Sequence, residues 1–209
     1  HTMIGLEEEL EHAISTIAEA SNPIVQITGI GGIGKTSFAY AIAQLAAETL
    51  LFDKIIWIRF PFGPAPPSHI PTNIIKQLKL ENSAGWDTIQ SALRNTKTLL
   101  ILDNLHPEHI DVSRRYMHDL SIESSLIITS RMKIDLDIPH TRIPINQHSP
   151  AQASEIMADQ AFKTSILPNR YVAQEESIYK AIGGNPLALK LLIGLLDSYD
   201  LHIILKELK

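Results

Sequence analysis

Hydrophobic positions along the first two thirds of the chain alternate between two patterns. Short apolar runs rich in β-branched and aromatic residues, without a helical period, predict buried strands. Longer stretches whose apolar residues recur every three or four positions predict amphipathic helices. The predicted strands are residues 24–28, 54–60, 98–102, 126–129 and 142–145, and the predicted helices are residues 4–22, 37–50, 72–80, 86–95 and 107–120. This alternation is typical of an α/β fold, a three-layer sandwich with a parallel central sheet.

Prolines refine this arrangement. Residues 61–71 contain five prolines, which predicts a loop without regular structure. Pro107 is expected in the first turn of its helix, where a missing N–H costs little. Pro144 lies in the last predicted strand, so that strand is expected at an edge of the sheet.

The pattern changes near Asn146, after which only helices are predicted. A capping box at residues 149–152 starts one helix, and a second covers residues 172–182. Asn185 is expected to cap a third helix that begins at Pro186. Leucines on all sides of that helix predict that it is the buried centre of a small all-α domain. We therefore expect two domains, at residues 1–146 and 147–209.

The sequence Gly29-Ile30-Gly31-Gly32-Ile33-Gly34-Lys35-Thr36 joins the first strand to the next helix. A glycine-rich loop in this context predicts a P-loop, whose backbone N–H groups cradle phosphates. Lys35 would supply charge to the β- and γ-phosphates and Thr36 a hydroxyl to Mg²⁺, at the positive end of a helix. The alternative is a glycine-rich turn without a ligand. The expected nucleotide contacts are Gly31, Gly32, Ile33, Gly34, Lys35, Thr36 and Ser37.

Asp103 and Asn104 follow the third predicted strand. A carboxylate at this position reaches the Mg²⁺ of a P-loop nucleotide, so Asp103 and Thr36 are the predicted metal ligands. The alternative role for Asp103 is an ordinary turn residue. Asn104 stands where many P-loop ATPases place a carboxylate. An amide can orient water but cannot take its proton, which predicts slow hydrolysis unless Glu108 or another group substitutes.

Arg131 follows the fourth predicted strand, and ligands of such sheets bind beyond the carboxyl ends of the strands. Its guanidinium could make paired hydrogen bonds to the γ-phosphate. The alternative is a surface arginine that pairs with Asp135 or Asp137. Asp103, Asn104 and Arg131 are thus the candidate catalytic residues.

His106 and His109 are one helical turn apart and could suggest a metal pair. No third ligand at a suitable spacing is apparent in the sequence, so a capping or surface role is the better interpretation.

Composition describes an ordinary globular protein of 209 residues, 44% hydrophobic and 20% charged. A net charge of −5 argues against a broad basic surface for nucleic acid or anionic lipid. The absence of cysteine excludes disulfides and fits a reducing compartment, so a cytoplasmic location is expected. No apolar run is long enough to span a bilayer, and no membrane partner is expected. His1-Thr2-Met3 resembles an expression scar.

Together these residues resemble the NB-ARC branch of the STAND signalling ATPases, the nucleotide-binding oligomerisation module of NLR-like receptors, here of bacterial type. The P-loop, the strand ending in Asp103-Asn104 as Walker B, and the strand ending in Thr129-Ser130-Arg131 as sensor match that family in order. Gly184-Asn185-Pro186-Leu187 resembles the family's proline-leucine motif. The resemblance implies a P-loop NTPase fold followed by an ARC1-like helical domain.

The resemblance also implies how adenine is bound. Pro186 would line the base pocket, and the residues before the first helix, Ile4 and Gly5, would approach the base. The family usually has an arginine after that glycine, whereas this chain has Leu6, so one polar contact to the nucleotide would be absent. The family's winged-helix domain would follow the helical domain, so we expect a longer protein with sensor and effector domains. Met117-His118-Asp119 repeats that domain's motif only by coincidence.

The expected function is a signalling switch that binds ADP or ATP with Mg²⁺, hydrolyses ATP slowly and self-associates when active. One alternative is a turnover ATPase of the AAA class, for which Arg114 or Arg115 could act in trans. Another is a nucleotide-dependent nucleic-acid binder, which the negative charge disfavours.

Overall fold

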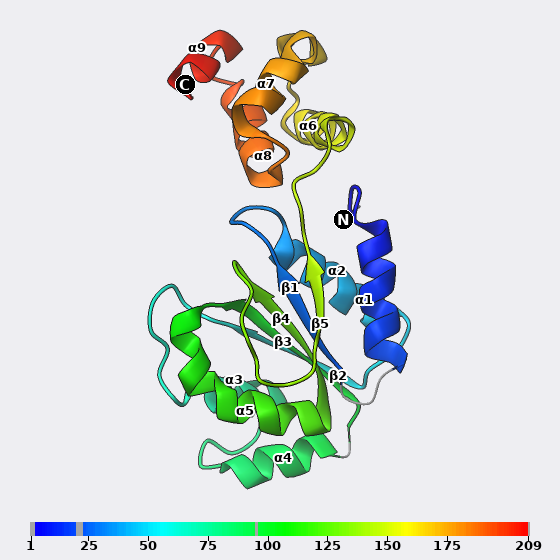
Figure 1. Ribbon diagram of the computed structural model, residues 1–209, viewed down its shortest axis with the longest axis vertical. Coiled ribbons are helices and arrows are strands. Elements are labelled where there is room, and N and C mark those ends of the chain that lie inside the picture. The colour runs from blue at the N-terminus through cyan, green and yellow to red at the C-terminus, as the bar shows by residue number, and fades with distance from the viewer. Residues whose placement is uncertain (1–2, 20–22, 95, 209) are drawn as a thin grey trace. The chain divides into compact units, whose positions relative to one another are not determined.

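The computed structural model describes residues 3–19, 23–94 and 96–208, so His1 and Thr2 of the expected scar lie outside it. These residues form two compact units (Figure 1). The sheet unit consists of Glu8–Gly29 and Lys35–Pro144. The helical unit consists of the residues up to Glu7, the loop Ile30–Gly34 and the chain from Ile145 onward. The domain boundary expected at residue 146 stays a prediction.

The sheet unit contains a five-stranded sheet in the order β2-β3-β4-β1-β5. Every neighbouring pair is parallel, and β5 lies at an edge as its proline predicts. The strands are β1 (Ile24–Thr28), β2 (Lys54–Arg59), β3 (Thr98–Leu105), β4 (Ser124–Ser130) and β5 (Thr141–Pro144).

Helices cover both faces of this sheet (Figure 1). They are α1 (Glu7–Glu19), α2 (Lys35–Glu48), α3 (His69–Leu78), α4 (Trp86–Arg94) and α5 (Ile110–Glu123), the last preceded by the 3-10 helix η1 (Pro107–His109). One core joins α3, α4 and α5 to alternate strand residues such as Ile58, Leu102 and Ile128. The intervening residues Ile27, Leu99 and Ile101 are also fully buried, and α2 contacts β1, β3 and β4. Burial on both faces explains the continuous apolar runs, and the α/β prediction is confirmed.

Several predicted boundaries are wrong, among them those of the first helix, of α3 and of β3. The first helix begins at Glu7 rather than Ile4, because Gly5 has a φ of +67°, which a helix cannot accommodate. Helix α3 begins at His69, inside the predicted loop, because Pro71 occupies its first turn. Strand β3 continues through Asp103 and Asn104 to Leu105.

The helical unit consists of α6 (Pro150–Thr164), α7 (Glu175–Ile182), α8 (Pro186–Leu195), α9 (Leu201–Glu207) and the 3-10 helices η2 (Pro168–Arg170) and η3 (Val172–Gln174). The predicted caps are confirmed: Ser149 and Gln152 form a capping box on α6, and Asn185 caps α8. Among the described residues, no helix has both the length and the apolar character that crossing a bilayer requires.

The prediction that α8 is buried on all sides is wrong. Leu189 and Leu192 lie in the core of the helical unit. Leu187, Leu191 and Leu195 are 52%, 60% and 45% exposed and follow one another at intervals of four residues. A stripe at this spacing lies on one face of a helix, so α8 packs on the core of the helical unit through its opposite face.

The turn before α8 passes very close to the segment before α6. The His148 backbone N–H donates to the Gly184 carbonyl at 3.0 Å, and the Tyr179 hydroxyl donates to the His148 carbonyl at 3.0 Å. A Cβ on Gly184 would overlap the His148 carbonyl oxygen. Glycine is therefore required here by space.

Replacing Gly184 with alanine should destabilise the helical unit by about 1–3 kcal/mol, because backbone must move to admit the methyl group. Gly194→Ala is the matched control, since a Cβ on Gly194, within α8, meets no atom within 4 Å. The control should raise the free energy of unfolding by up to about 1 kcal/mol. Urea unfolding followed by circular dichroism measures both. Equal midpoints for the two variants would contradict this close approach.

Candidate nucleotide-binding site

The carboxyl ends of parallel strands meet at one edge of the sheet, where open α/β folds bind ligands. Arg59 at the end of β2 is in register with Asp103 of β3, and Leu105 of β3 with Ser130 of β4. Within β1, Thr28 is in register with the same Ser130. The predicted Walker B and sensor residues therefore share this edge.

Asp103 is the centre of a small polar cluster. Its side chain is fully buried, and its Oδ1 accepts hydrogen bonds from Thr36 Oγ1 at 2.8 Å and from Thr129 Oγ1 at 2.7 Å. Its Oδ2 has no hydrogen-bond partner among the described residues, although Arg59 Nε lies 3.6 Å away. A buried carboxylate oxygen with no hydrogen bond is costly, and it is an atom that a hard cation or its water would satisfy.

These residues fit Mg²⁺ in one specific way. Mg²⁺ is usually held by one or two carboxylates together with phosphate oxygens and water. The described residues contain no cluster of three or more His, Cys, Asp or Glu side chains suited to a metal. Asp103 and the Thr36 hydroxyl can therefore supply part of a shell that a phosphate ligand would complete.

Lys35 lies in the first turn of α2, and its Nζ donates to the Gly29 carbonyl at 2.7 Å. Burial lowers the pKa of Lys35, the positive charge of Arg131 lowers it further, and Asp103 acts in the opposite direction. The charged form is thus less favourable here than in water. An anion near the ammonium group would stabilise the charged form of Lys35.

The loop tip Ile30–Gly34 bends through conformations that favour glycine. Gly32 has a φ of +77° and Gly34 a φ of +107°. Gly32 also lies close to the start of α8 within the helical unit. A Cβ there would lie 2.9 Å from both Asn185 Oδ1 and Leu187 Cβ.

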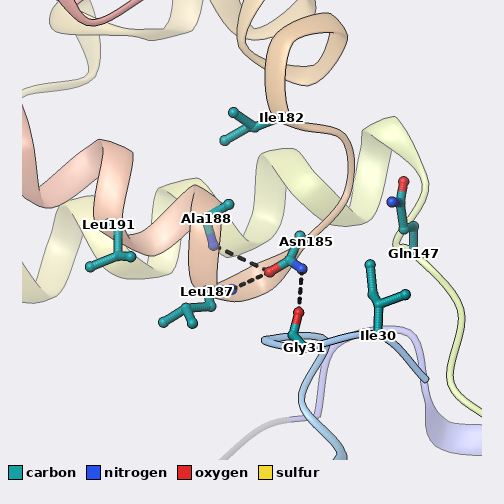
Figure 2. A pocket seen from close by; sticks show the side chains of 8 residues that line it. All are labelled: Ile30, Gly31, Gln147, Ile182, Asn185, Leu187, Ala188 and Leu191. Carbon is teal, nitrogen blue, oxygen red and sulfur yellow. Dashed lines mark hydrogen bonds between the residues drawn. The ribbon is translucent and has the colours of Figure 1, made fainter. Parts of the chain in front are cut away.

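The start of α8 binds the carbonyl groups of this loop. Asn185 Nδ2 donates to the Gly31 carbonyl at 2.8 Å, and the Leu187 backbone N–H donates to the Gly32 carbonyl at 3.3 Å. Asn185 Oδ1 meanwhile accepts from the backbone N–H groups of Leu187 and Ala188 (Figure 2). One asparagine thus caps α8 and holds the loop.

An open pocket of about 380 Å³ lies beside this contact (Figure 2). Its size is within the range of small-molecule sites, and its lining is mostly apolar. It is lined by Ile30, Gly31, Gln147, Ile182, Asn185, Leu187, Ala188 and Leu191.

The predicted adenine contacts Ile4, Gly5 and Pro186 are not among the residues that line this pocket. Pro186 stands between two lining residues without being one itself. Ile4 and Gly5 are held by α6 and the segment before it: His148 Nε2 donates to the Ile4 carbonyl at 3.0 Å, and Gln152 Nε2 donates to the Gly5 carbonyl at 3.5 Å. Leu6, which replaces the family's usual arginine, is buried.

Arg131 is exposed, and its guanidinium carbon lies 5.7 Å from the centre of the Phe62 ring, a cation–π arrangement. The alternative was a pairing of Arg131 with Asp135 or Asp137. Among the described residues Arg131 forms an ion pair with neither, and Asp137 pairs instead with Arg114 at 3.0 Å. The side chain of Arg115, the other proposed trans arginine, lies outside the described residues.

Two contacts in the site were missed by sequence reasoning. The first is the approach of Arg59 to Asp103. The sequence feature that could have revealed it is a basic residue at the end of the strand that neighbours the Walker B strand. Asn185 binds the loop, and its predicted role as a cap gave no sign of this second contact. His109 has a capping role, as expected: its Nδ1 accepts from the His106 backbone N–H at 3.2 Å.

Several known proteins are similar to this chain in sequence. Disease resistance protein RGA4 of Solanum bulbocastanum is 28% identical over 187 residues, which cover 83% of this chain and 19% of that protein. A disease resistance protein of Arabidopsis thaliana is 22% identical over 145 residues, covering 64% of this chain and 17% of that protein. The chain therefore spans less than a fifth of the length of these relatives.

Solved structures show the same fold. A STAND protein with a tetratricopeptide repeat sensor from Pyrococcus horikoshii has a TM-score of 0.59 and 21% identity, covering 95% of this chain and 31% of its own. The replication initiator DnaA, bound to AMPPCP and single-stranded DNA, has a TM-score of 0.64 and 14% identity, covering 99% of this chain and 65% of its own. The NB-ARC domain profile matches residues 6–164, well over half of the sequence. The chain therefore belongs to the NB-ARC domain family.

Proposed function

We propose that this chain is the nucleotide-binding part of a switch that holds ADP at rest and ATP when active. The observation that carries the proposal is the cluster of Thr36, Thr129 and Asp103, with one carboxylate oxygen left without a hydrogen bond. Burial lowers the pKa of Lys35 in the adjoining helix turn, so its charged form is less favourable there than in water. A magnesium nucleotide would offer a cation to the second oxygen of Asp103 and an anion to the Lys35 ammonium group.

Each predicted residue has a part in this binding. Loop N–H groups from Gly31 to Gly34, together with those of Thr36 and Ser37 at the start of α2, receive the phosphates. Thr36 and Asp103 hold Mg²⁺, which when bound neutralises charge on the β- and γ-phosphates.

The base is proposed to occupy the apolar pocket beside Asn185. Apolar side chains of the lining, such as Leu187 and Leu191, can pack against the face of an adenine ring. Ile4, Gly5 and Pro186 act at its margins in this proposal.

In this proposal Arg131 and Asn104 are the residues through which the site distinguishes ATP from ADP. The Arg131 guanidinium lies over the Phe62 ring, a cation–π contact worth about 0.5–1 kcal/mol at exposed sites. Hydrogen bonds of a guanidinium to phosphate are stronger, so a γ-phosphate draws Arg131 away from Phe62. Asn104 orients water without accepting its proton, so hydrolysis is slow. Turnover faster than about one per second, typical of working enzymes, would favour an ATPase of the AAA class instead.

The switch acts within a longer protein. The relatives are several times longer than this chain, and two of them are disease resistance proteins. Nucleotide exchange is proposed to change the arrangement of domains and permit self-association, with sensor and effector domains supplied by the full-length cytoplasmic protein. Such coupling requires that ADP and ATP favour different arrangements.

Replacing Lys35 with alanine should weaken ADP binding about 10- to 100-fold, the equivalent of losing one charge-assisted hydrogen bond to phosphate. Lys133→Ala removes an exposed lysine close in sequence to Arg131 and is the matched control, with a change of no more than about twofold. Isothermal titration calorimetry with ADP and Mg²⁺ measures both. A wild-type chain that binds no ADP, or equal affinities for both variants, would refute the proposal.

Replacing Ala188 with phenylalanine should fill the pocket beside Asn185 and weaken ADP binding about tenfold or more, since overpacking costs 1–3 kcal/mol. Binding of inorganic pyrophosphate should not change, because it has no base. Leu195→Phe, on the exposed face of α8 and outside the pocket, is the control. Competition against a fluorescent ADP analogue gives both affinities. An equal loss of affinity for ADP and for pyrophosphate would show that the adenine base does not bind in this pocket.

A further inference from the structure

A chain of hydrogen bonds leads from the polar cluster around Asp103 to two histidines. It runs within the sheet unit from Asn104 through His106 to His109 and ends on the segment after β2. From the sequence we expected only a capping or surface role for these histidines. Their tautomers and the direction of the Asn104 amide follow from the partners they have.

The side chain of Asn104 is held on both sides. Its Nδ2 donates to the Phe60 carbonyl at 3.3 Å, so its Oδ1 faces His106 Nε2 at 3.1 Å. An amide oxygen only accepts, so His106 Nε2 carries the proton and donates it. Only one lone pair of Oδ1 is used in this way, and the second can accept from water.

The backbone of Asn104 is fixed by the same hydroxyl that serves Asp103. Its N–H donates to Thr129 Oγ1 at 2.8 Å, and this hydroxyl donates onward to Asp103 Oδ1. Its φ of +65° is a left-handed conformation that asparagine tolerates better than most residues. The position of Asn104 next to Asp103, the proposed metal ligand, is therefore well defined.

His109 in turn fixes His106. The His106 backbone N–H donates to His109 Nδ1 at 3.2 Å, so the proton of His109 is on Nε2, which donates to the Gly63 carbonyl at 2.8 Å. His109 is fully buried and stacks on Phe60, with ring centres 4.7 Å apart and planes at 25°. This buried ring gives the His106 backbone a rigid support.

We propose that His106 is a positioning residue for the slow hydrolysis of ATP: its Nε2–H holds the Asn104 amide so that Oδ1 orients the attacking water. In this step the water oxygen bonds to the γ-phosphorus and the bond from that phosphorus to the β–γ bridging oxygen breaks. ADP leaves, and the water proton passes to a phosphate oxygen, since the amide cannot accept it. The inference rests on the proposed function and adds to it the residue that sets the amide's direction.

The test compares two substitutions of His106 in single-turnover hydrolysis of bound ATP. His106→Leu removes the donor and should slow hydrolysis about 10- to 100-fold, the usual cost of losing orientation. His106→Gln retains an N–H donor at the end of its side chain and should stay within about threefold of wild type, because the amide remains held. Neither should change ADP affinity, which depends on other residues. His12→Leu, an exposed histidine of α1, is the control for loss of a histidine.

The outcomes separate this inference from the proposed function. His106→Leu hydrolysing at the wild-type rate would overturn the inference alone, provided that ADP binding is intact. Equal slowing of both His106 variants would also overturn it, because a merely structural loss is not rescued by a new donor. If the wild-type protein binds ATP but does not hydrolyse it, the proposed role of His106 is also overturned. Wild-type protein that binds no nucleotide would overturn both proposals.

Discussion

The buried carboxylate of Asp103 is the interaction on which the rest of the site depends. A charge removed from water is expensive unless hydrogen bonds or a cation compensate for it. Two threonine hydroxyls provide that compensation at Oδ1, one from the first turn of α2 and one from β4. Asp103 thus joins three elements at the edge of the sheet, and its second oxygen, 3.6 Å from Arg59 Nε, has no hydrogen-bond partner among the described residues. The contacts that hold this carboxylate belong to the fold itself, so its position does not depend on a bound ligand.

Carbonyl groups of the glycine loop are bound in a way that orients its N–H groups. The C=O and the N–H of one planar peptide unit point in opposite directions. Within the helical unit, Asn185 and Leu187 bind the carbonyls of Gly31 and Gly32, which directs the N–H groups of the residues that follow each glycine away from α8. The loop therefore depends on residues more than 150 positions later in the chain to hold its peptide planes.

Sequence reasoning found the parts of the fold and of the site whose cause is local. The glycine loop, the apolar strand around Leu102 and the cap at Asn185 each depend on neighbouring residues. The existence of all five strands and the caps at Ser149 and Asn185 were predicted correctly, although some strand ends were not. It failed where packing between distant segments decides the outcome. The leucines of α8 gave no indication of which would be exposed, because the answer depends on how small the surrounding unit is. The contact between Asn104 and His106 was also hidden, because it depends on the left-handed backbone of Asn104 and on the distant carbonyl of Phe60.

The segment that follows β2 links the ends of three strands. The Phe60 carbonyl accepts from Asn104 near the end of β3, and the Gly63 carbonyl accepts from His109 in the helical turn η1 that follows. Phe62 lies under Arg131, which follows β4. Each contact is modest, about 0.5–1.5 kcal/mol for a hydrogen bond or an exposed cation–π pair. Because they share one short segment, moving any one of the three residues strains the other two contacts. If a γ-phosphate binds Arg131 as proposed, the resulting pull on Phe62 reaches the segment that also supports the Asn104 amide. The proposed phosphate contact and the proposed orientation of water would then be coupled through this one segment.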